Sequence, residues 1–310
     1  MEKKYVIVEH PEYGYRHLSP IPSAEEVEKF YREEFYSSQY GLCNDSSQEK
    51  QSEDRIFNHG RYEDICAILE GQLGPLHGKS LFDIGCGFGE LLLFAQEKGM
   101  QVAGMEVVPE AVSFLQGKNI SVFLSTIDDT DFSHMSQGKR YSVVTLLNVL
   151  EHLREPARTL REIREQLLEP NGVLVVDVPN EFNPLQTAAR DVLGLGEWWV
   201  AAPVHINYFT PVSLQRLLQA CGYEVIDLLS SFPLELFLLM GDVYVGDNIL
   251  GHQCHKKRVL FEENLRKAGK SAELRDFYRM LGNGGFGRQI VCFGKVDAYS
   301  IATSPKQIEG

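Results

Sequence analysis

The stretch SLFDIGCGFGELL, residues 80–92, constrains the fold of this chain more than any other segment. It begins with an apolar run that carries one acid, Asp83, and continues into glycines at alternate positions, Gly85, Gly87 and Gly89. A helical run, ELLLFAQEKG, follows directly. Glycine permits positive φ and close approach of another group to the backbone. The stretch therefore predicts a buried strand, a tight turn and a helix.

Further apolar runs repeat this alternation of strand and helix along the chain. The expected strands are SLFDIG, QVAGMEV, ISVFLS, YSVVTLLN, GVLVVDVP, YEVIDLLS and, near the C-terminus, RQIVCFGKV. Apolar runs separated by helices are typical of a parallel sheet that is covered on both faces. We therefore expect an α/β fold with a doubly wound, mostly parallel, Rossmann-like sheet.

The pattern along the chain suggests four regions. Ser23 and Glu26 form a capping box, so residues 1–75 are expected to be an N-terminal helical segment. We expect this segment to lie on the side of the molecule where the substrate that accepts the transferred group binds. Residues 76–231 and 286–297 would form the sheet domain, with an irregular segment at about 180–209. Residues 232–285 are interpreted as an insertion that covers the acceptor site, and residues 298–310 as a disordered tail.

Charge and cysteine content narrow the range of partners. The formal net charge is −13, so phosphate backbones and anionic lipid surfaces would repel the chain. We expect a small-molecule acceptor, with no nucleic acid and no membrane as partners, and the oligomeric state stays open. Six cysteines without a C-x-x-C pair, and an N-terminal stretch without a long apolar core, suggest a cytoplasmic protein.

The glycine turn predicts a nucleoside-containing cofactor. Glu106 ends the second expected strand, 23 residues after Asp83, where a carboxylate can accept hydrogen bonds from a ribose diol. A purely structural turn would explain the glycines but not this acid. The dinucleotide fingerprint G-x-G-x-x-G would need glycine at position 90, which is Glu90. Asp83 also disfavours a pyrophosphate and suits a cofactor that carries an ammonium group.

Three segments together resemble class I S-adenosylmethionine-dependent methyltransferases. These segments are FDIGCGFGELL, GMEVVPEAV and VVTLLNVLEHLREPARTLREIREQLLEPNGVLVVDVPN, and the resemblance spans about residues 79–230. The branch that is most similar contains the ubiquinone-biosynthesis methyltransferases. The resemblance implies S-adenosyl-L-methionine as the cofactor and a seven-stranded sheet whose last strand is antiparallel.

The resemblance also implies roles for single residues. The Asp83 side chain and the backbone of Gly85, Gly87 and Gly89 would hold the methionine part of the cofactor. Glu106 would hold the ribose, and Asn148 would contact the methionine part. The adenine would lie against Val107, Ile127 and Asp128.

Two histidines are candidates for the base that an oxygen acceptor usually needs. His152 follows the fourth expected strand, and His205 lies in the segment after the fifth. Histidine titrates near neutrality, which suits proton transfer. Each has a plainer interpretation, as a capping or packing residue for His152 and as a loop residue bonded to backbone for His205. Neighbouring aromatics, Trp198, Trp199, Tyr208 and Phe209, line an acceptor pocket or pack the segment.

The expected insertion contains GHQCHKKR, residues 251–258. His252, Cys254 and His255 suggest a metal, but no second ligand cluster stands at zinc spacing, so no metal site is predicted. Lys256, Lys257 and Arg258 are either a solvated face or a contact for a phosphate or carboxylate of the acceptor.

The sequence thus favours a methyltransferase that acts on a small polar acceptor, with O-methylation favoured by the two histidines. A sugar or sugar nucleotide of a surface polysaccharide pathway is one candidate acceptor, and C- or N-methylation stays open. The competing functions are an NAD(P)-dependent dehydrogenase or epimerase, which the glycine spacing disfavours, and a non-catalytic protein that binds the same cofactor.

Overall fold

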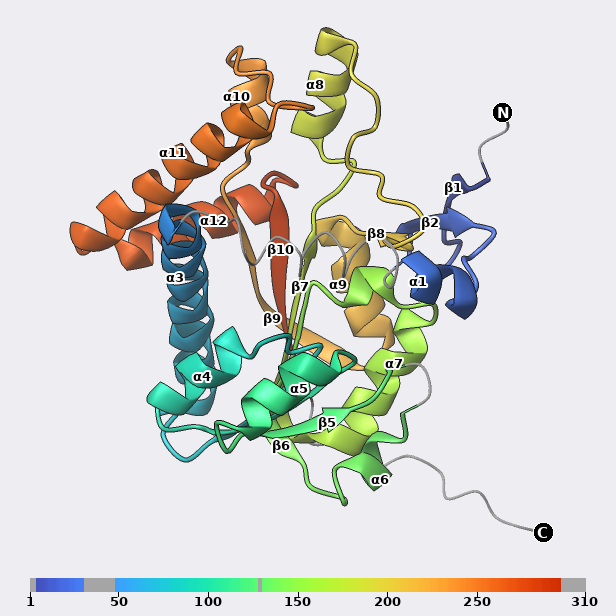
Figure 1. Cartoon of the computed structure of the whole chain (residues 1–310), viewed down its shortest axis with the longest axis vertical. Coiled ribbons are helices and arrows are strands. Elements are labelled where there is room, and N and C mark those ends of the chain that lie inside the picture. The colour runs from blue at the N-terminus through green and yellow to red at the C-terminus, as the bar shows by residue number, and fades with distance from the viewer. Residues whose placement is uncertain (1–3, 31–47, 128–129, 297–310) are drawn as a thin grey trace. The chain divides into compact units, whose positions relative to one another are not determined.

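The computed structural model describes residues 4–30, 48–127 and 130–296, which form two compact units. Of the described residues, the sheet unit contains those within Ile68–Asp177, Leu214–Leu228 and 291–296. The helical unit contains residues 4–30 and 48–67, Val178–Ser213 and Leu229–Ile290. Figure 1 labels the elements along the chain. The division differs from the expected domain boundaries, because residues 178–213 group with the N-terminal segment and the expected insertion.

The sheet unit contains a seven-stranded sheet with the strand order β5-β4-β3-β6-β7-β10-β9. Strands β3 to β7 pair in parallel, and the last strand, β10, is antiparallel, so the expected fold class is confirmed. The strands are β3 Ser80–Ile84, β4 Gln101–Glu106, β5 Ser121–Leu124, β6 Tyr141–Leu147, β7 Leu168–Pro179, β9 Tyr223–Ser230 and β10 Gln289–Val296.

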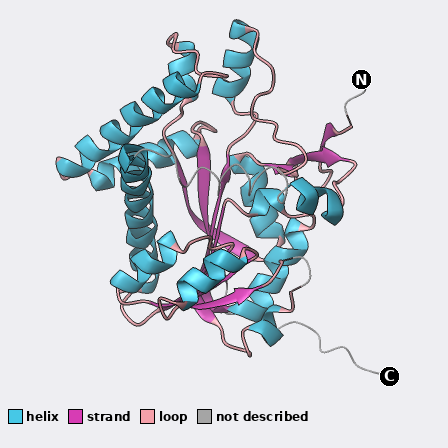
Figure 2. Ribbon diagram, in the orientation of Figure 1, coloured by secondary structure: helices cyan, strands magenta, loops and turns pink. Residues whose placement is uncertain are grey.

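Helices flank this sheet, as Figure 2 shows in cyan against the magenta strands. Apolar side chains at helical spacing drive this packing; α4, for example, buries Leu91, Leu92 and Phe94. The helices are α4 Glu90–Glu97, α5 Pro109–Gln116, α6 Phe132–Met135, the short 3₁₀ turn η3 Leu150–His152, α7 Pro156–Glu162, the π-turn η4 Ile163–Leu167 and α9 Pro211–Ala220.

The helical unit begins with a β-hairpin, so the expectation of an all-helical N-terminal segment is wrong. β1 Val6–Glu9 pairs antiparallel with β2 Arg16–Ser19, and β2 pairs with β8 Asn207–Tyr208. The β-branched run at residues 6–8 favours a strand. The predicted capping box is confirmed at α1 Ala24–Phe30, where the Ser23 N–H donates to Glu26 at 2.9 Å.

Besides α1, the described part of this unit contains five helices. They are α3 Gln48–Leu73, which continues into the sheet unit, α8 Pro184–Leu193, α10 Glu235–Leu239, α11 Asn248–Lys267 and α12 Ser271–Asn283. Helix α8 corrects the expected irregular segment at 180–209. Asn183 caps it by accepting from the N–H groups of Leu185 and Gln186, and Pro184 occupies its first position.

Charged contacts join the helices of this unit. Asp64 on α3 is buried and pairs with Arg266 on α11 and Arg275 on α12, at 2.5 Å and 3.1 Å. Tyr278 on α12 donates a hydrogen bond to Glu262 on α11 at 2.7 Å. Among the described residues, no helix has both the length and the apolar character needed to cross a bilayer.

Candidate functional site

The carboxyl ends of β3, β4 and β6 form the edge of the sheet where the predicted cofactor residues gather. The strand order runs from β3 to β4 on one side and from β3 to β6 on the other, so the direction of winding reverses beside β3. Open α/β sheets bind ligands at such a reversal, beyond the carboxyl ends of the strands. The positions of Asp83, Glu106 and Asn148 all follow from this topology.

The glycine turn after β3 has the backbone conformation that the sequence predicted. Gly85, Gly87 and Gly89 all have positive φ, at 70°, 51° and 75°. A Cβ added to Gly85 would lie 2.7 Å from the Val149 side chain, so this glycine is required by packing. A Cβ on Gly87 would meet nothing within 4 Å. The backbone of Gly87 is therefore open to a ligand, as a cofactor turn needs.

Glu106 binds the glycine turn directly, a contact that the sequence did not reveal. One carboxylate oxygen accepts from the Gly87 N–H at 2.8 Å, and the other from Val107 and Val108 at 2.7 and 3.1 Å. A carboxylate has about four acceptor sites, so these three bonds leave room for one more. A ribose diol that donated twice would displace the Gly87 bond.

Asp83 is a buried acid that accepts a hydrogen bond from the neighbouring strand β6. It is 4% exposed, and its carboxylate accepts from the hydroxyl of Thr145, its register partner on β6, at 2.5 Å. Burial is the main cause that raises the pKa of Asp83, to about 7, and the nearby charge of Glu106 adds to it. A cofactor ammonium at this edge would stabilise the ionised carboxylate, so the residue fits the methionine part of the predicted cofactor.

Apolar side chains beside Glu106 fit the adenine part. Val107 is 48% exposed directly after β4, and Leu124 is 58% exposed at the end of β5. Phe88 in the glycine turn and Phe114 on α5 are also exposed, with ring centroids 5.7 Å apart. Sequence reasoning missed these two rings and Leu124, although Phe88 lies between Gly87 and Gly89 and Leu124 is the register partner of Glu106.

The remaining predicted cofactor residues differ in what the structure shows of them. Ile127 is half-buried beyond β5, and Asp128 lies outside the described residues. Asn148 is exposed, has φ of 56° and donates its backbone N–H to Asp177 at 2.8 Å. A positive φ at a non-glycine residue is uncommon and concentrates at functional positions. The edge thus combines backbone donors, two acids and an apolar surface within one unit.

Comparison with known proteins identifies the family. The family described as "Methyltransferase domain" matches residues 57–228, which is more than half of the chain. The chain belongs to this methyltransferase family. It is a class I enzyme that uses S-adenosylmethionine and acts on small molecules, as the sequence predicted.

Two curated relatives of this methyltransferase are ubiquinone biosynthesis O-methyltransferases. The protein of Cereibacter sphaeroides is 30% identical over 175 residues, which cover 53% of this chain and 69% of the relative. The protein of Aeromonas salmonicida is 32% identical over 162 residues, covering 50% of this chain and 67% of the relative.

Solved structures share the fold at low identity. A 1,6-didemethyltoxoflavin-N1-methyltransferase of Burkholderia thailandensis, bound to S-adenosylhomocysteine, has a TM-score of 0.50 and 16% identity over 96% of this chain and 97% of that one. The [4+2]-cyclase SpnF has a TM-score of 0.52 and 13% identity over 90% and 98%. These likenesses show the fold alone, and the cyclase illustrates that the fold does not fix the reaction.

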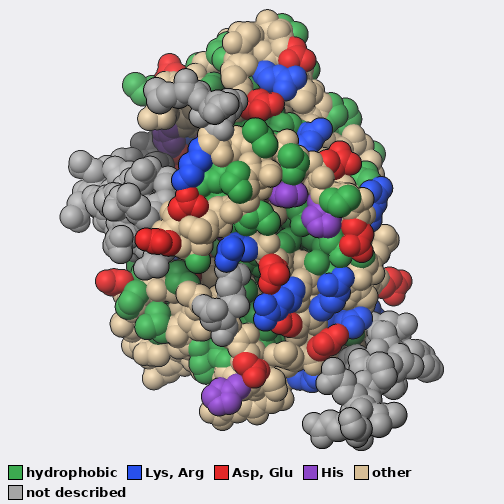
Figure 3. All heavy atoms as spheres, turned by 90° about the vertical axis from the view of Figure 1, so that its right-hand side faces the viewer, with side chains coloured by type: hydrophobic (Ala, Val, Ile, Leu, Met, Phe, Trp, Pro, Cys, Tyr) green, Lys and Arg blue, Asp and Glu red, His purple; other side chains and the backbone are tan. Residues whose placement is uncertain are grey.

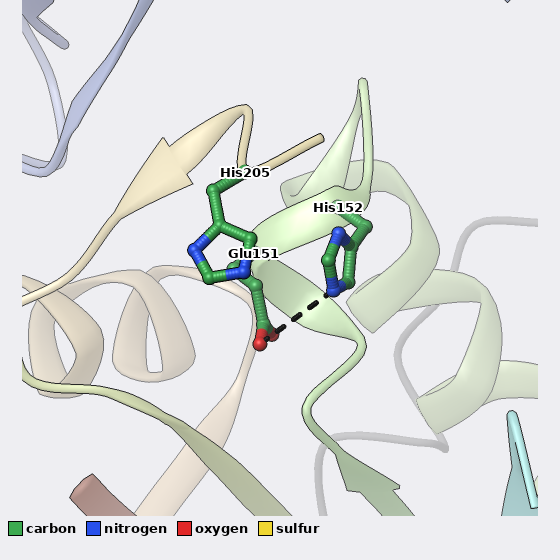
Figure 4. A group of neighbouring side chains, drawn as sticks. All are labelled: Glu151, His152 and His205. Carbon is green, nitrogen blue, oxygen red and sulfur yellow. Dashed lines mark ion pairs between the residues drawn. The ribbon is translucent and has the colours of Figure 1, made fainter. Parts of the chain in front are cut away.

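In this methyltransferase, His152 belongs to the sheet unit and lies in the η3 turn that follows β6. His152 is half-buried, and its Nε2 lies 3.8 Å from the buried carboxylate of Glu151, as Figure 4 shows with a dashed line. Glu151 is 2% exposed, so it is a buried acid and not a solvated one. The turn begins two residues after Asn148, so His152 belongs to the same strand end as the cofactor residues.

His205, also labelled in Figure 4, belongs to the helical unit and lies just before β8. Its Nδ1 is 3.8 Å from the carboxylate of Glu181, which is 2% exposed. Sequence reasoning missed Glu181, although it lies two residues after β7, at the start of the segment in which His205 was predicted to act. The Glu181 N–H donates to Phe209 at 3.1 Å, which fixes this segment beside β8.

The basic run of α11, which the sequence left as either a solvated face or an acceptor contact, has an acidic or histidine neighbour for each charge. Lys256 pairs with Glu53 at 3.1 Å and Lys257 with Asp242 at 2.8 Å. Arg258 is buried, bonds to His255 at 2.8 Å and stacks on Phe57; its burial lowers its pKa to about 10. All three side chains thus have partners within the helical unit, and only Arg258 is buried there.

Proposed function

We propose that this methyltransferase O-methylates a small polar acceptor and that His152 accepts the hydroxyl proton. The observation that carries the proposal is the His152–Glu151 pair on the strand end that also holds Asn148. A buried carboxylate beside a histidine favours the charged imidazolium that forms when the ring takes a proton. The names of the relatives, O-methyltransferases, support oxygen as the atom that is methylated.

The proposed reaction needs only the acceptor and the methyl donor as reactants. When bound, S-adenosylmethionine supplies an electrophilic methyl group. His152 takes the proton from the acceptor hydroxyl as the oxygen forms its bond to the methyl carbon, while the carbon–sulfur bond breaks and its electron pair stays on sulfur. The products are the methyl ether, S-adenosylhomocysteine and a protonated histidine, which then releases its proton to water. The backbone of Gly87 and the side chain of Glu106 contribute by fixing the cofactor in line.

The second pair, His205 and Glu181, is the alternative base. Its geometry resembles that of the first pair, with 3.8 Å between the ring nitrogen and the carboxylate oxygen. Loss of an effective general base lowers the rate about 10²- to 10⁴-fold. The histidine that acts as base is therefore the one whose removal gives this loss and changes the pH–rate profile.

The acceptor class is proposed from two sources. The name of the relatives points to a phenolic hydroxyl, as in a ubiquinone precursor. The sequence resemblance left a sugar or sugar nucleotide as a second candidate, and C- or N-methylation as the alternative reaction. We also propose the cytoplasm as the compartment, because the described cysteines are buried and not in disulfides.

The test is turnover with a methyl-labelled donor across a panel of catechols, sugar nucleotides and amines. We expect label on an oxygen of one class, and a loss of about 10²-fold or more for His152→Ala. His134→Ala, an exposed histidine on α6, is the matched control and should match the parent. If His205→Ala alone gives the loss, the base assignment moves to the second pair. Label found only on nitrogen or carbon overturns O-methylation.

A further inference from the structure

The helical unit contains a cleft that the methyltransferase reaction does not explain. Its volume is about 860 Å³, within the range of pockets that hold small molecules. None of the predicted cofactor residues lines it. The lining residues come from the hairpin, the start of α8 and the segment after it, and they include Ile7, Arg16, Leu18, Phe182, Val200 and Ala202.

One wall of the cleft is the hairpin. Arg16 lies opposite Glu9 in the strand register, and Leu18 lies opposite Ile7, so these four side chains share one face. Leu18 is fully buried and Ile7 is half-buried, which makes the floor apolar. Val200 and Ala202 add apolar surface from the other wall. Such a cleft suits a ligand with an apolar or flat body.

The cationic side chains that line the cleft differ in whether they form ion pairs. Lys4 pairs with Glu26, and Arg190 pairs with Asp191 at 2.8 Å and Glu197 at 3.2 Å. Within residues 4–30, 48–127 and 130–296, the Arg16 guanidinium makes no hydrogen bond or ion pair, although Glu9 faces it across the hairpin. Instead it lies 4.3 Å from the centroid of the Phe182 ring.

Phe182 is a rigid support for this guanidinium. Its φ of 59° is unusual for an aromatic residue, and its ring makes edge contacts with Trp199 and Tyr208 at 5.3 and 5.8 Å. A stacked guanidinium keeps its N–H donors at the ring edge, where they can bind an oxyanion in two bonds. Because the support is held from two sides, little side-chain entropy remains to be lost when a ligand binds.

We propose that this cleft binds a small molecule that carries a phosphate or carboxylate, with the oxyanion on Arg16 and the apolar body on Leu18, Val200 and Ala202. The site goes beyond the proposed function, because it requires neither the cofactor nor methyl transfer. Glu9 opposes the ligand through its like charge and so moderates the affinity. Figure 3 shows cationic, acidic and apolar side chains interspersed on the side of the molecule where Figure 1 labels β1 and β2.

The test is calorimetric titration of the full chain, without S-adenosylmethionine, with uridine diphosphate, uridine, inorganic pyrophosphate and benzoate. Binding by the nucleotide and pyrophosphate identifies a phosphate, and binding by benzoate alone identifies a carboxylate. Uridine should not bind measurably. Arg16→Gln should weaken binding of the oxyanion at least 10-fold, whereas Glu9→Gln should strengthen it about 2- to 5-fold. Arg279→Gln, on an exposed ion pair of α12, is the control and should change it less than 2-fold.

Two results would overturn the proposal: no oxyanion binds the parent chain, or Arg16→Gln binds as well as the parent. If Arg16→Gln does not fold, Val200→Trp replaces it, because the larger ring fills the cleft from its other wall. We expect that variant to abolish binding while its unfolding transition stays close to that of the parent. Unchanged affinity in Val200→Trp would equally contradict the proposal.

Discussion

The cofactor edge of the sheet unit and the cleft of the helical unit differ in how their residues are distributed along the chain. The cofactor edge is built from residues 83–148, and its main contacts join backbone N–H groups to Glu106 and the Thr145 hydroxyl to Asp83. The cleft combines a hairpin at residues 6–19 with the segment at 182–202, and its unit is joined by side-chain ion pairs between distant helices. A site built from residues that are close along the chain is recognisable as a sequence motif, whereas contacts between distant segments give almost no motif.

Removing a distant ion pair should therefore be the most damaging change in the helical unit. Asp64→Asn leaves Arg266 and Arg275 without their carboxylate, and we expect the free energy of unfolding to fall by about 3 kcal/mol. The matched variant Asp276→Asn removes an exposed pair within α12 and should cost below about 1 kcal/mol. Denaturant unfolding measures both. Equal losses would show that distant pairs do not hold this unit together.

The glycine turn should be nearly as sensitive, for a different reason. Gly85→Ala adds a Cβ at positive φ that also contacts Val149, so we expect a loss of about 2–3 kcal/mol. Gly74→Ala has a similar φ of 73° but meets nothing within 4 Å, and should cost about 1 kcal/mol. The comparison by thermal unfolding separates packing from backbone strain. A Gly74→Ala loss as large as that of Gly85→Ala would assign the whole effect to strain.

The protonation of Asp83 should have a smaller effect, which appears in the pH dependence of stability and in proton release on cofactor binding. Since folding raises the pKa of Asp83 to about 7 from 3.8, its contribution to stability is fully present below pH 4 and is lost as the pH rises through 7. If the cofactor ammonium lowers this pKa, binding at pH 7 should release up to about half a proton. Calorimetry in buffers of different ionisation enthalpy measures the release.

The control for this prediction is Asp83→Asn, which cannot titrate. Its cofactor binding should release no proton, and its stability between pH 4 and pH 7 should vary less than that of the parent. Proton uptake by the parent on binding the cofactor would contradict the expected role of Asp83.

The sequence predicted the seven strands, the glycine turn and the two acids, because each depends on residues that are close along the chain. It missed the hairpin of β1 and β2. The third strand of that small sheet, β8, lies almost two hundred residues later. It also missed α8, although Asn183, Pro184 and Gln186 form a clear start signal. Glu181 was missed since its only mark is its position after a buried strand, and its histidine lies 24 residues further along.

The basic run of α11 shows the same limit. The sequence left this cluster of positive charges as either a solvated face or an anion contact, and its partners Glu53 and Asp242 come from other elements. Arg16, which carries our proposal and has no ion-pair partner among the described residues, has no basic neighbours in the sequence apart from His17. Whether a charge is satisfied depends on the fold, so the sequence alone does not distinguish these two cases.

The most direct test of the central claim is calorimetric titration of S-adenosylmethionine into the parent chain, Glu106→Gln and Glu110→Gln. Glu106 bonds to the glycine turn and to the cofactor in our account, so Glu106→Gln should raise the dissociation constant about 10-fold or more. Glu110, an acid in the first turn of α5, should matter less than 2-fold. A parent chain that does not bind S-adenosylmethionine, or a Glu106→Gln variant that binds it as tightly as the parent, would contradict the account.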